Sequence, residues 1–531
     1  MDLGSALSIA SSGLNGIEYQ YSVISQNVAN SSTAGYASES ASVTSAVAGN
    51  QGTGVRIGQT VVNVSPYLQS SLYTQNAKVS ALTASSNSLA AVESVQGSTS
   101  SDSGSTQTLS DELGNVQSAL TSLTSTPLES SAQTAVITAA SSLTDTIHTL
   151  ASTYTQQRQT AEDGIVATVS TINQDLTQIG QLSKQIMGLQ AVGSDTSSLE
   201  NSRLQVMNDL STQLGVKFTE TSKGDMVVTT EDGTKLPTRP DQIGLNDNTQ
   251  TLPSNTWPLS ATNGGTASTT ITDKMYYDSS DPTNSAIAGI TVADGKTNTS
   301  STDITSHMTS GTLGANITLR DTTYPTMQAQ LNAFSATVIN RFTAAGMSLF
   351  TDGSGNTSVA VSTTGSNSSL TNLANTISVN ATYSDTPSKL APSGSVTTIS
   401  KVLSDTFGTS STNISGTTTL SDGTVVTLDS PTSDLGPDGT QTTGYSGAQG
   451  LVALATSLTS NQGATIGTAT TNLTYATAVQ TTISGKVTNV SGVNVNNEMS
   501  KIVALQNAYT ANAKIISSVQ TMFSALLDAI N

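Results

Sequence analysis

Both ends of the chain carry an apolar seam that repeats in alternating steps of four and three residues. All eight seam positions near the N-terminus are apolar: Leu3, Leu7, Ala10, Leu14, Ile17, Tyr21, Ile24 and Val28. This spacing is the heptad pattern of a coiled-coil helix. At 1.5 Å per residue the seam is about 39 Å long. The N-terminal segment is therefore predicted to be one long helix with a single apolar edge.

The C-terminal segment repeats the same spacing. Nine of its eleven seam positions are apolar: Val495, Ile502, Leu505, Tyr509, Ile516, Val519, Phe523, Leu526 and Ile530. The other two, Glu498 and Asn512, are polar seam residues, which cost stability and fix the register of a pair. An isolated helix of this kind is marginal in water because its apolar edge has nothing to cover.

The two ends are each other's natural partners. Burying the N-terminal seam contributes on the order of 10 kcal/mol before entropy, at about 1.5–3 kcal/mol per large side chain. The ends are therefore predicted to form a coiled-coil stalk, with each other or with neighbouring copies. We expect both helices to be loosely ordered in the free chain and to become firm on assembly.

Composition and charge exclude several classes of function. The net charge is −18 and the pI is near 4.3, so the chain would repel a nucleic-acid backbone. No run of eighteen apolar residues predicts a membrane span, and no basic stretch precedes Arg56 to form a signal peptide. The absence of cysteine excludes disulfides and thiolate chemistry. A composition rich in Ser and Thr and poor in Lys is typical of exported bacterial surface proteins.

Between the two ends, helical and β-like segments alternate. Ile165, Val169, Ile172 and Leu176 share one helix face, whereas the residues after Lys217 alternate with a period of two. Thr126-Pro127 is a predicted helix start. The predicted fold is α+β, elongated and multi-domain, with a coiled-coil stalk, a long-helix bundle and inserted β-rich domains. The expected divisions are paired terminal helices (1–36 and 490–531), a mainly helical body (37–235, 313–350 and 447–489), an inserted β-rich domain (236–312) and a second β-rich outer domain (351–446).

Candidates for catalysis are few. The only histidines, His148 and His307, lie in polar surroundings without a catalytic motif. The adjacent carboxylates Asp111 and Glu112 are better placed to favour a helix N-terminus than to act as an acid–base pair. The loop 351–358 lacks the closing Glu of an EF-hand. We therefore expect no enzyme activity, no catalytic residues, no cofactor and no metal.

The stretch SQNVANSSTAGY, which ends the first heptad run, is similar to the N-terminal signature of the bacterial flagellar axial proteins, the rod, hook and hook-associated subunits. The matching residues are Ser25, Asn27, Val28, Ala29, Asn30, Thr33, Gly35 and Tyr36. Asn and Thr side chains can bond nearby backbone groups and stop a helix, and Gly35 tolerates the positive φ of a turn. The C-terminus resembles the closing helix of the same family at Gly492, Val493, Asn494, Glu498, Gln506, Tyr509, Ala513, Ile516 and Leu526.

Two central segments resemble the hook-associated protein 1 family, whose members join the flagellar hook to the filament. The matching residues are Arg203, Leu210, Leu214, Gly215, Val216, Gly311, Leu313, Gly314, Leu319, Arg320, Asp321, Pro325, Gln330, Leu331 and Phe342. The chain departs from the family pattern at Ala34, where Pro is common, and at Asn63, where Arg is usual. Residues 390–446 match no segment of the family.

The resemblance implies a structural subunit at the hook–filament junction. Its seam residues from Leu3 to Val28 and from Ile502 to Ile530 would form the assembly interface, and heterologous contacts would build a helical tube. The implied partners are further copies of the chain, the hook protein, a second hook–filament junction protein and a cytoplasmic export chaperone on the C-terminal helix. The implied location is the extracellular flagellum, reached through the flagellar channel without a cleaved signal. The alternatives are another axial protein, hook-like or the second junction subunit, and an exported surface adhesin.

Overall fold

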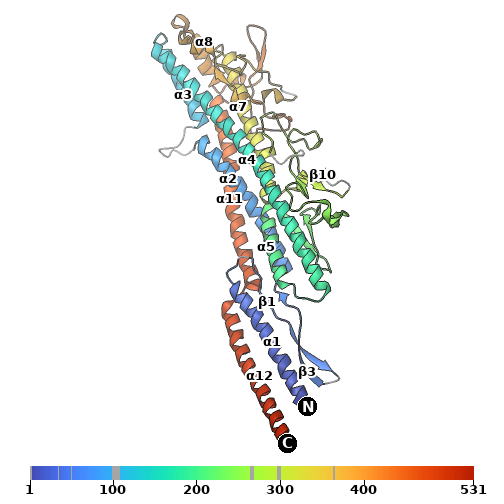
Figure 1. Ribbon diagram of the computed structural model, residues 1–531. Helices are drawn as coiled ribbons and strands as arrows, with labels where there is room; N and C mark the ends of the chain where they lie inside the picture. Colours follow the sequence, from blue (N-terminus) through green and yellow to red (C-terminus); the bar gives the residue numbers. More distant parts are fainter. Residues whose placement is uncertain are drawn as a thin grey trace.

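A computed structural model describes residues 3–33, 35–48, 51–97, 108–262, 268–295, 300–362 and 365–530. The molecule is elongated, with a two-helix stalk at one end and a bundle of long helices above it (Figure 1). The stalk consists of α1 (Leu3–Ala29) and α12 (Val495–Ile530). Among the described residues, no helix is both long and apolar enough to cross a membrane.

Helices, most of them long, make up the body. They are α2 (Pro66–Gln96), α3 (Leu109–Ser125), α4 (Ser130–Ala191), α5 (Ser197–Gln213), α6 (Gly311–Thr318), α7 (Tyr324–Ala344) and α11 (Leu451–Ser491). The 62 residues of α4 extend about 90 Å at 1.5 Å per residue. Two chain segments far apart in sequence, α2 and α11, pack along each other and run from the stalk into the body (Figure 1).

The helix periodicity explains which faces are buried. The predicted face of α4, from Ile165 to Leu176, is buried against α5 and the sheet beside it. The predicted helix start at Thr126 is wrong, because Thr126 caps the end of α3 and α4 begins only at Ser130. Thr126 and Pro127 instead form part of the short turn between two consecutive helices, since proline cannot continue the first one.

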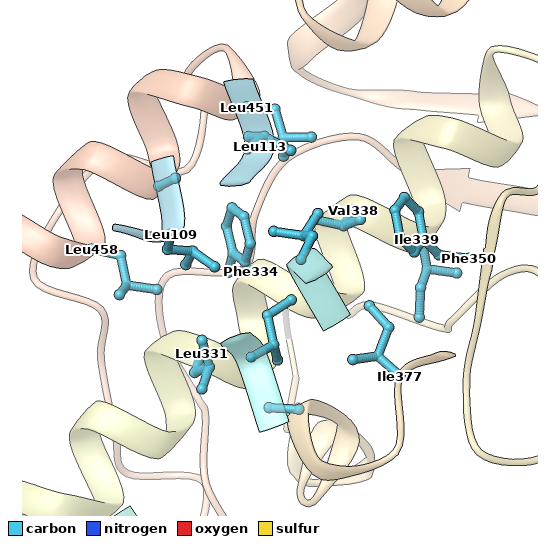
Figure 2. Packing of buried hydrophobic residues seen from close by; sticks show 14 of the residues in the cluster. Leu109, Leu113, Leu331, Phe334, Val338, Ile339, Phe350, Ile377, Leu451 and Leu458 are labelled. Atoms are coloured by element: carbon cyan, nitrogen blue, oxygen red, sulfur yellow. The ribbon is translucent and has the colours of Figure 1, made fainter. Parts of the chain in front are cut away.

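The main core lies around α7, which is buried on every side rather than on one face. In Figure 2, Leu331, Phe334 and Val338 of α7 lie among side chains of α3 and α11, with Leu113 and Leu451 at the border of the cluster. Helices that are covered all round belong to the interior of large bundles. The body therefore forms around α7 as its central helix.

The lower part of the molecule holds small antiparallel sheets. They are built from β1 (Glu39–Ser40) with β4 (Val61–Val62), β2 (Val43–Ala48) with β3 (Gln51–Ile57), and β5 (Val216–Glu220), β6 (Met226–Thr230) and β7 (Lys235–Leu236) in that order. The β2–β3 hairpin lies beside α1 (Figure 1). The β5–β6–β7 sheet packs one face on the helices of the body.

The segments expected to be β-rich contain only short strands. These are β8 (Leu259–Ser260), β9 (Thr291–Ala293), β10 (Ser300–Asp303), β11 (Phe350–Thr351), β12 (Ser378–Val379), β13 (Thr417–Thr419) and β14 (Val425–Thr427). Short α-helices intervene at α8 (Ala381–Ser384), α9 (Thr397–Lys401) and α10 (Ser411–Ile414). Polar side chains compete for the backbone here: Asp352 accepts hydrogen bonds from the backbone of Ser354 and Asn356, a pattern that favours turns over ladders.

One buried arginine organises the outer segment. Arg341 of α7 donates to the backbone oxygens of Leu428 at 2.8 Å, Gln449 at 2.6 Å and Ile414 at 3.0 Å. Its burial lowers the pKa of the Arg341 guanidinium to about 10. These bonds tie residues 414–449 to the central helix, because each carbonyl would otherwise lose a partner on burial.

Candidate assembly site

The terminal helices α1 and α12 pack side by side and run in opposite directions, so that both chain ends lie at the same end of the molecule (Figure 1). Of the α1 seam, Ala10 and Ile24 are buried and Tyr21 is exposed. The other five positions are half-buried: Leu3, Leu7, Leu14, Ile17 and Val28. The structure therefore brings the two predicted seams together but does not cover either one completely.

The predicted face of α12 is covered unevenly. Val519 is buried and Ile502, Leu505 and Ile516 are half-buried. Three more are exposed: Tyr509, Phe523 and Leu526. Ile530 ends the helix, and its side chain lies outside the described residues.

The offset of the pair explains this gradient. A Cβ added at Gly13 would lie 3.3 Å from Oδ1 of Asn512, which places these two residues opposite each other. Leu3 lies ten residues before Gly13, so in this antiparallel pair it is level with a residue about ten positions after Asn512, near Met522. In Figure 1 the C-terminus accordingly extends past the N-terminus. The last turns of α12 therefore have no part of α1 opposite them within the described chain.

Further exposed apolar residues of α12 lie on both sides of the predicted seam. Met499, Val503 and Leu527 each follow a seam position, and Ile515 and Met522 each precede one, so the two groups flank the seam on opposite sides. Adjacent apolar pairs such as Ile502-Val503 and Leu526-Leu527 are the signal that points to them. A helix with apolar residues on more than one side needs more than one partner.

The two polar seam residues have defined surroundings. Asn512 lies against Gly13, and its Nδ2 donates to the backbone oxygen of Ala508 at 3.1 Å. Glu498 is buried, and one carboxylate oxygen accepts from Nζ of Lys501 at 2.7 Å. Gly13 allows the close approach of the amide because it has no Cβ.

The stalk joins the body through a cluster that we call the joint: Asn27, residues 36–39, Asn201 and Ser491. Asn27 donates from Nδ2 to the Glu39 backbone oxygen at 2.8 Å, and its Oδ1 accepts from the Glu39 N–H at 2.8 Å. The Tyr36 hydroxyl donates to the same Oδ1 at 3.0 Å. The Asn27 side chain thus binds the backbone as a neighbouring strand would.

The body binds the same short segment from the other side. The amide of Asn201 on α5 accepts from the Ala37 N–H at 2.9 Å and donates to the Ala37 oxygen at 3.1 Å and to Oε1 of Glu39 at 2.8 Å. The Ser38 N–H donates to the Ser491 oxygen at the end of α11, at 2.6 Å. Residues 37–39 therefore connect α1, α5 and α11 in one hydrogen-bonded unit.

The remaining motif residues end the helix. The chain turns at Gly35, whose φ is +78°. Asn30 donates to the Gln26 oxygen at 3.1 Å, and Thr33 donates to Oδ1 of Asn30 at 3.4 Å. Ala29 is the last residue of α1, and both it and Thr33 are exposed. Of the six motif residues, Asn27 and Tyr36 lie in the joint, and the other four lie along the turn.

Burial controls the charges at the joint. It raises the pKa of the Tyr36 phenol, and the nearby carboxylates Glu39 and Glu498 raise it further. Burial likewise raises the pKa of Glu39. At Asp195, burial opposes ionisation, but hydrogen bonds from Thr60 and Ser197 outweigh it and lower the pKa. The joint is thus a hydrogen-bonded polar cluster in which the charged forms of Tyr36 and Glu39 are disfavoured.

The two histidines and Asp111 each have a defined partner in the structure. Nε2 of His148 lies 2.7 Å from the Ile377 oxygen, and His307 pairs with Asp232 on the surface. Asp111 completes a capping box with Thr108 at the start of α3. In the part of the chain that the structure describes, no three His, Cys, Asp or Glu residues are grouped so as to hold a metal ion.

Comparison with protein families decides the identity of the chain. The family described as "Flagellar hook-associated protein FlgK helical domain" matches residues 97–357, and "Flagellar basal body rod FlgEFG protein C-terminal" matches residues 485–529. Residues 97–357 carry the helical domain of the flagellar hook-associated protein family. The family matches thus include most of the body and nearly all of α12.

A search of the solved structures finds the flagellar hook junction protein FlgK from Burkholderia pseudomallei at 19% identity and a TM-score of 0.38. The similarity covers 54% of this chain and 45% of that one, so the match spans less than half the length of that protein. A search of the curated proteins finds no match.

Proposed function

We propose that this chain is a structural, non-enzymatic subunit of the bacterial flagellum that assembles at the hook–filament junction and connects hook to filament. The observation that carries the proposal is the incomplete cover of the terminal helices. Tyr509, Phe523 and Leu526 lie on the predicted face of α12 and remain exposed in the single chain. Family membership supplies the flagellar setting.

The energetics favour assembly through these helices. Large apolar side chains along α12 each contribute about 1.5–3 kcal/mol when they are buried. Exposed apolar residues on either side of the face that α1 covers, such as Met499 and Met522, can be covered by further copies. An interface between two different surfaces of the same chain is heterologous, and repetition of such an interface builds an open helical array.

The proposed partners are further copies of the chain, the hook protein and a second hook–filament junction protein. A cytoplasmic export chaperone would bind α12 before assembly, because α12 is the most exposed apolar helix end in the described chain. Export would proceed through the flagellar channel in a largely unfolded state. The absence of cysteine suits this route, since no disulfide has to be broken or formed.

Truncation tests the proposal. Removal of about thirty residues from either end should leave cells with bare hooks, while the purified truncated chain keeps the cooperative unfolding of its body. A finer variant changes Leu526 and Leu527 to Ser. Its matched control changes Leu128 and Val425 to Ser, because these side chains are similarly exposed, at 72% and 61%, but lie in the turn between α3 and α4 and on β14.

The outcomes separate clearly. We expect the Leu526→Ser, Leu527→Ser variant to lose filaments and the control to keep them, with the body of each purified chain unfolding as in the parent. Normal filament attachment by the truncated chains would refute the structural role. Loss of filaments in the control alone would refute the assignment of the interface to α12.

A further inference from the structure

A groove with a cavity volume of about 500 Å³ runs beside β5. All five consecutive strand residues, Val216–Glu220, line it. Successive side chains of a strand point to opposite faces, so a groove over one face would touch only alternate residues. Contact with all five places the groove along the backbone edge of the strand.

This edge of β5 carries unpaired backbone groups. β5 is the outer strand of its sheet, and within the described residues no strand pairs with its other side. The Thr230 N–H donates to the Thr234 oxygen in the turn to β7. The backbone groups of the adjacent Thr229 therefore point the other way, toward β5, where Thr229 pairs with Lys217. In an antiparallel pair, the backbone groups of successive residues point alternately toward the partner strand and away from it, so the residues that present their backbone to the groove are Val216, Phe218 and Glu220.

The walls of the groove suit an extended segment. Pro66 and Leu204 line it from α2 and α5, and the ring of Tyr73 meets Phe218 edge-on at 4.9 Å. Its acidic end holds Glu220, which pairs with Arg203 at 2.7 Å, and nearby Glu200 also lines the groove. Addition of a strand to an open sheet edge, with side chains in flanking pockets, is a recurring mode of recognition.

The β2–β3 hairpin offers a second open edge. β3 faces the stalk, because the Val55 N–H donates to Oγ of Ser12 on α1 at 3.2 Å. The Gly58 N–H donates to the Ser42 oxygen at 2.8 Å, so the backbone of Ser42 points toward β3. Along an antiparallel strand, successive residues point their backbone groups alternately toward the partner and away from it, so the backbone groups of Ser45, three residues later, point away from β3. β2 is therefore the outer strand of the hairpin.

We propose that β2 of one copy pairs with the groove edge of β5 in a neighbouring copy, which extends the β5–β6–β7 sheet to five strands. The inference rests on the proposed function and names one contact of the assembly. The hairpin's single charged residue, Arg56, is exposed and has no ion pair in the described chain. It complements Glu220 and Glu200 at the acidic end of the groove.

The two edges cannot meet within one molecule. β3 crosses α1 beside Gly16, which is eleven residues, or about 17 Å, below Asn27 in the joint. Glu220 pairs with Arg203, two residues after Asn201, which puts the middle of β5 about 10 Å above the joint. The edges are thus separated by about 25 Å along the axis. Their pairing requires copies offset by that distance, and this contact is heterologous and open-ended.

Cysteine cross-linking tests the pairing, because the chain has no cysteine of its own. The test variant is Thr44→Cys with Thr219→Cys, two exposed positions whose side chains alternate with the edge-facing residues. Opposed Cβ atoms of paired strands lie about 4.5–5.5 Å apart. The matched control is Thr44→Cys with Lys235→Cys, an exposed position on β7 at the far edge of the same sheet.

Flagella from cells carrying each variant as the sole copy are isolated, treated with a short bismaleimide and analysed on denaturing gels. We expect cross-linked multimers from the Thr44/Thr219 variant and monomers from the control. Chain that is present in intact flagella but fails to cross-link at Thr44/Thr219, or that cross-links to a different protein there, overturns the pairing. Absence of the chain from flagella would instead refute the proposed function as well.

A backbone variant gives an independent measurement. Ser45→Pro removes an N–H from the open edge of β2 and leaves the bonds to β3 intact. We expect it to abolish the Thr44/Thr219 cross-link, whereas Ser45→Ala keeps it. Equal cross-linking in both variants would show that the backbone edge is not used and would overturn the proposal.

Discussion

The joint makes a quantitative prediction about Asn27. This side chain is 1% exposed and holds both the N–H and the C=O of Glu39 at 2.8 Å. Asn27→Ala would leave two buried backbone groups without partners. Each such group costs about 1–3 kcal/mol, so the substitution should weaken the joint by about 3 kcal/mol. The loss of the Tyr36 bond at 3.0 Å adds to this figure.

Amide hydrogen exchange measures this cost directly. A loss of about 3 kcal/mol corresponds to roughly 100-fold faster exchange, since each 1.4 kcal/mol is a factor of ten. The acceleration should be confined to the end of α1 and residues 37–40, while the core around α7 keeps its protection. Asn30→Ala is the matched control, because Asn30 donates only to Gln26 within its own helix end.

The reasoning fails if Asn27→Ala exchanges within about threefold of the parent at residues 37–40, or if Asn30→Ala produces the same acceleration. Either result would mean that the paired bonds of Asn27 do not hold the segment. An acceleration that spread evenly through the body would also contradict the account, because it would make Asn27 part of the global fold.

Three further predictions concern the body. Burial and the nearby Asp209 raise the pKa of Asp175 to about 7. Because the folded state then holds the proton more tightly than the unfolded state, the free energy of unfolding should fall as pH rises from about 4 to 7. Asp175→Asn should flatten this pH dependence in thermal unfolding at pH 5–8. Glu162→Gln removes one of the two carboxylates that pair with the buried Arg320, at 2.7 Å. Asp321 still pairs with this arginine, so the substitution should cost about 1–3 kcal/mol in chemical denaturation; an unchanged midpoint would contradict it. Arg341→Met should lower the free energy of unfolding by about 3 kcal/mol and expose residues 414–449 to limited proteolysis. Protease resistance equal to that of the parent would show that the arginine does not hold this segment.

The sequence predicts the helices of the stalk well because their signal is local. Apolar residues at alternating steps of four and three identify α1 and α12. The polar seam residue Asn512 lies opposite Gly13 of α1. The seam pattern does not include the exposed apolar residues on either side of it, such as Met499 and Met522. A single periodic template records the strongest face and leaves a weaker adjacent face unassigned.

The joint could not be predicted from periodicity. Asn201 binds Ala37 across 164 residues of sequence, and no local pattern encodes such a contact. The motif pointed to Asn27 and Tyr36 without indicating that Asn27 binds the backbone of Glu39. Short strands in the outer segment were also overestimated, because Ser, Thr and Asn favour turns bonded by their own side chains as readily as strands.

The central claim is that the terminal helices obtain their full cover only from neighbouring copies. Amide exchange across residues 3–29 and 495–530, compared between dilute purified chain and chain in isolated flagella, tests it most directly. The account predicts rapid exchange at both ends in the dilute chain and strong protection after assembly. Equally strong protection of both ends in the dilute monomer would contradict it.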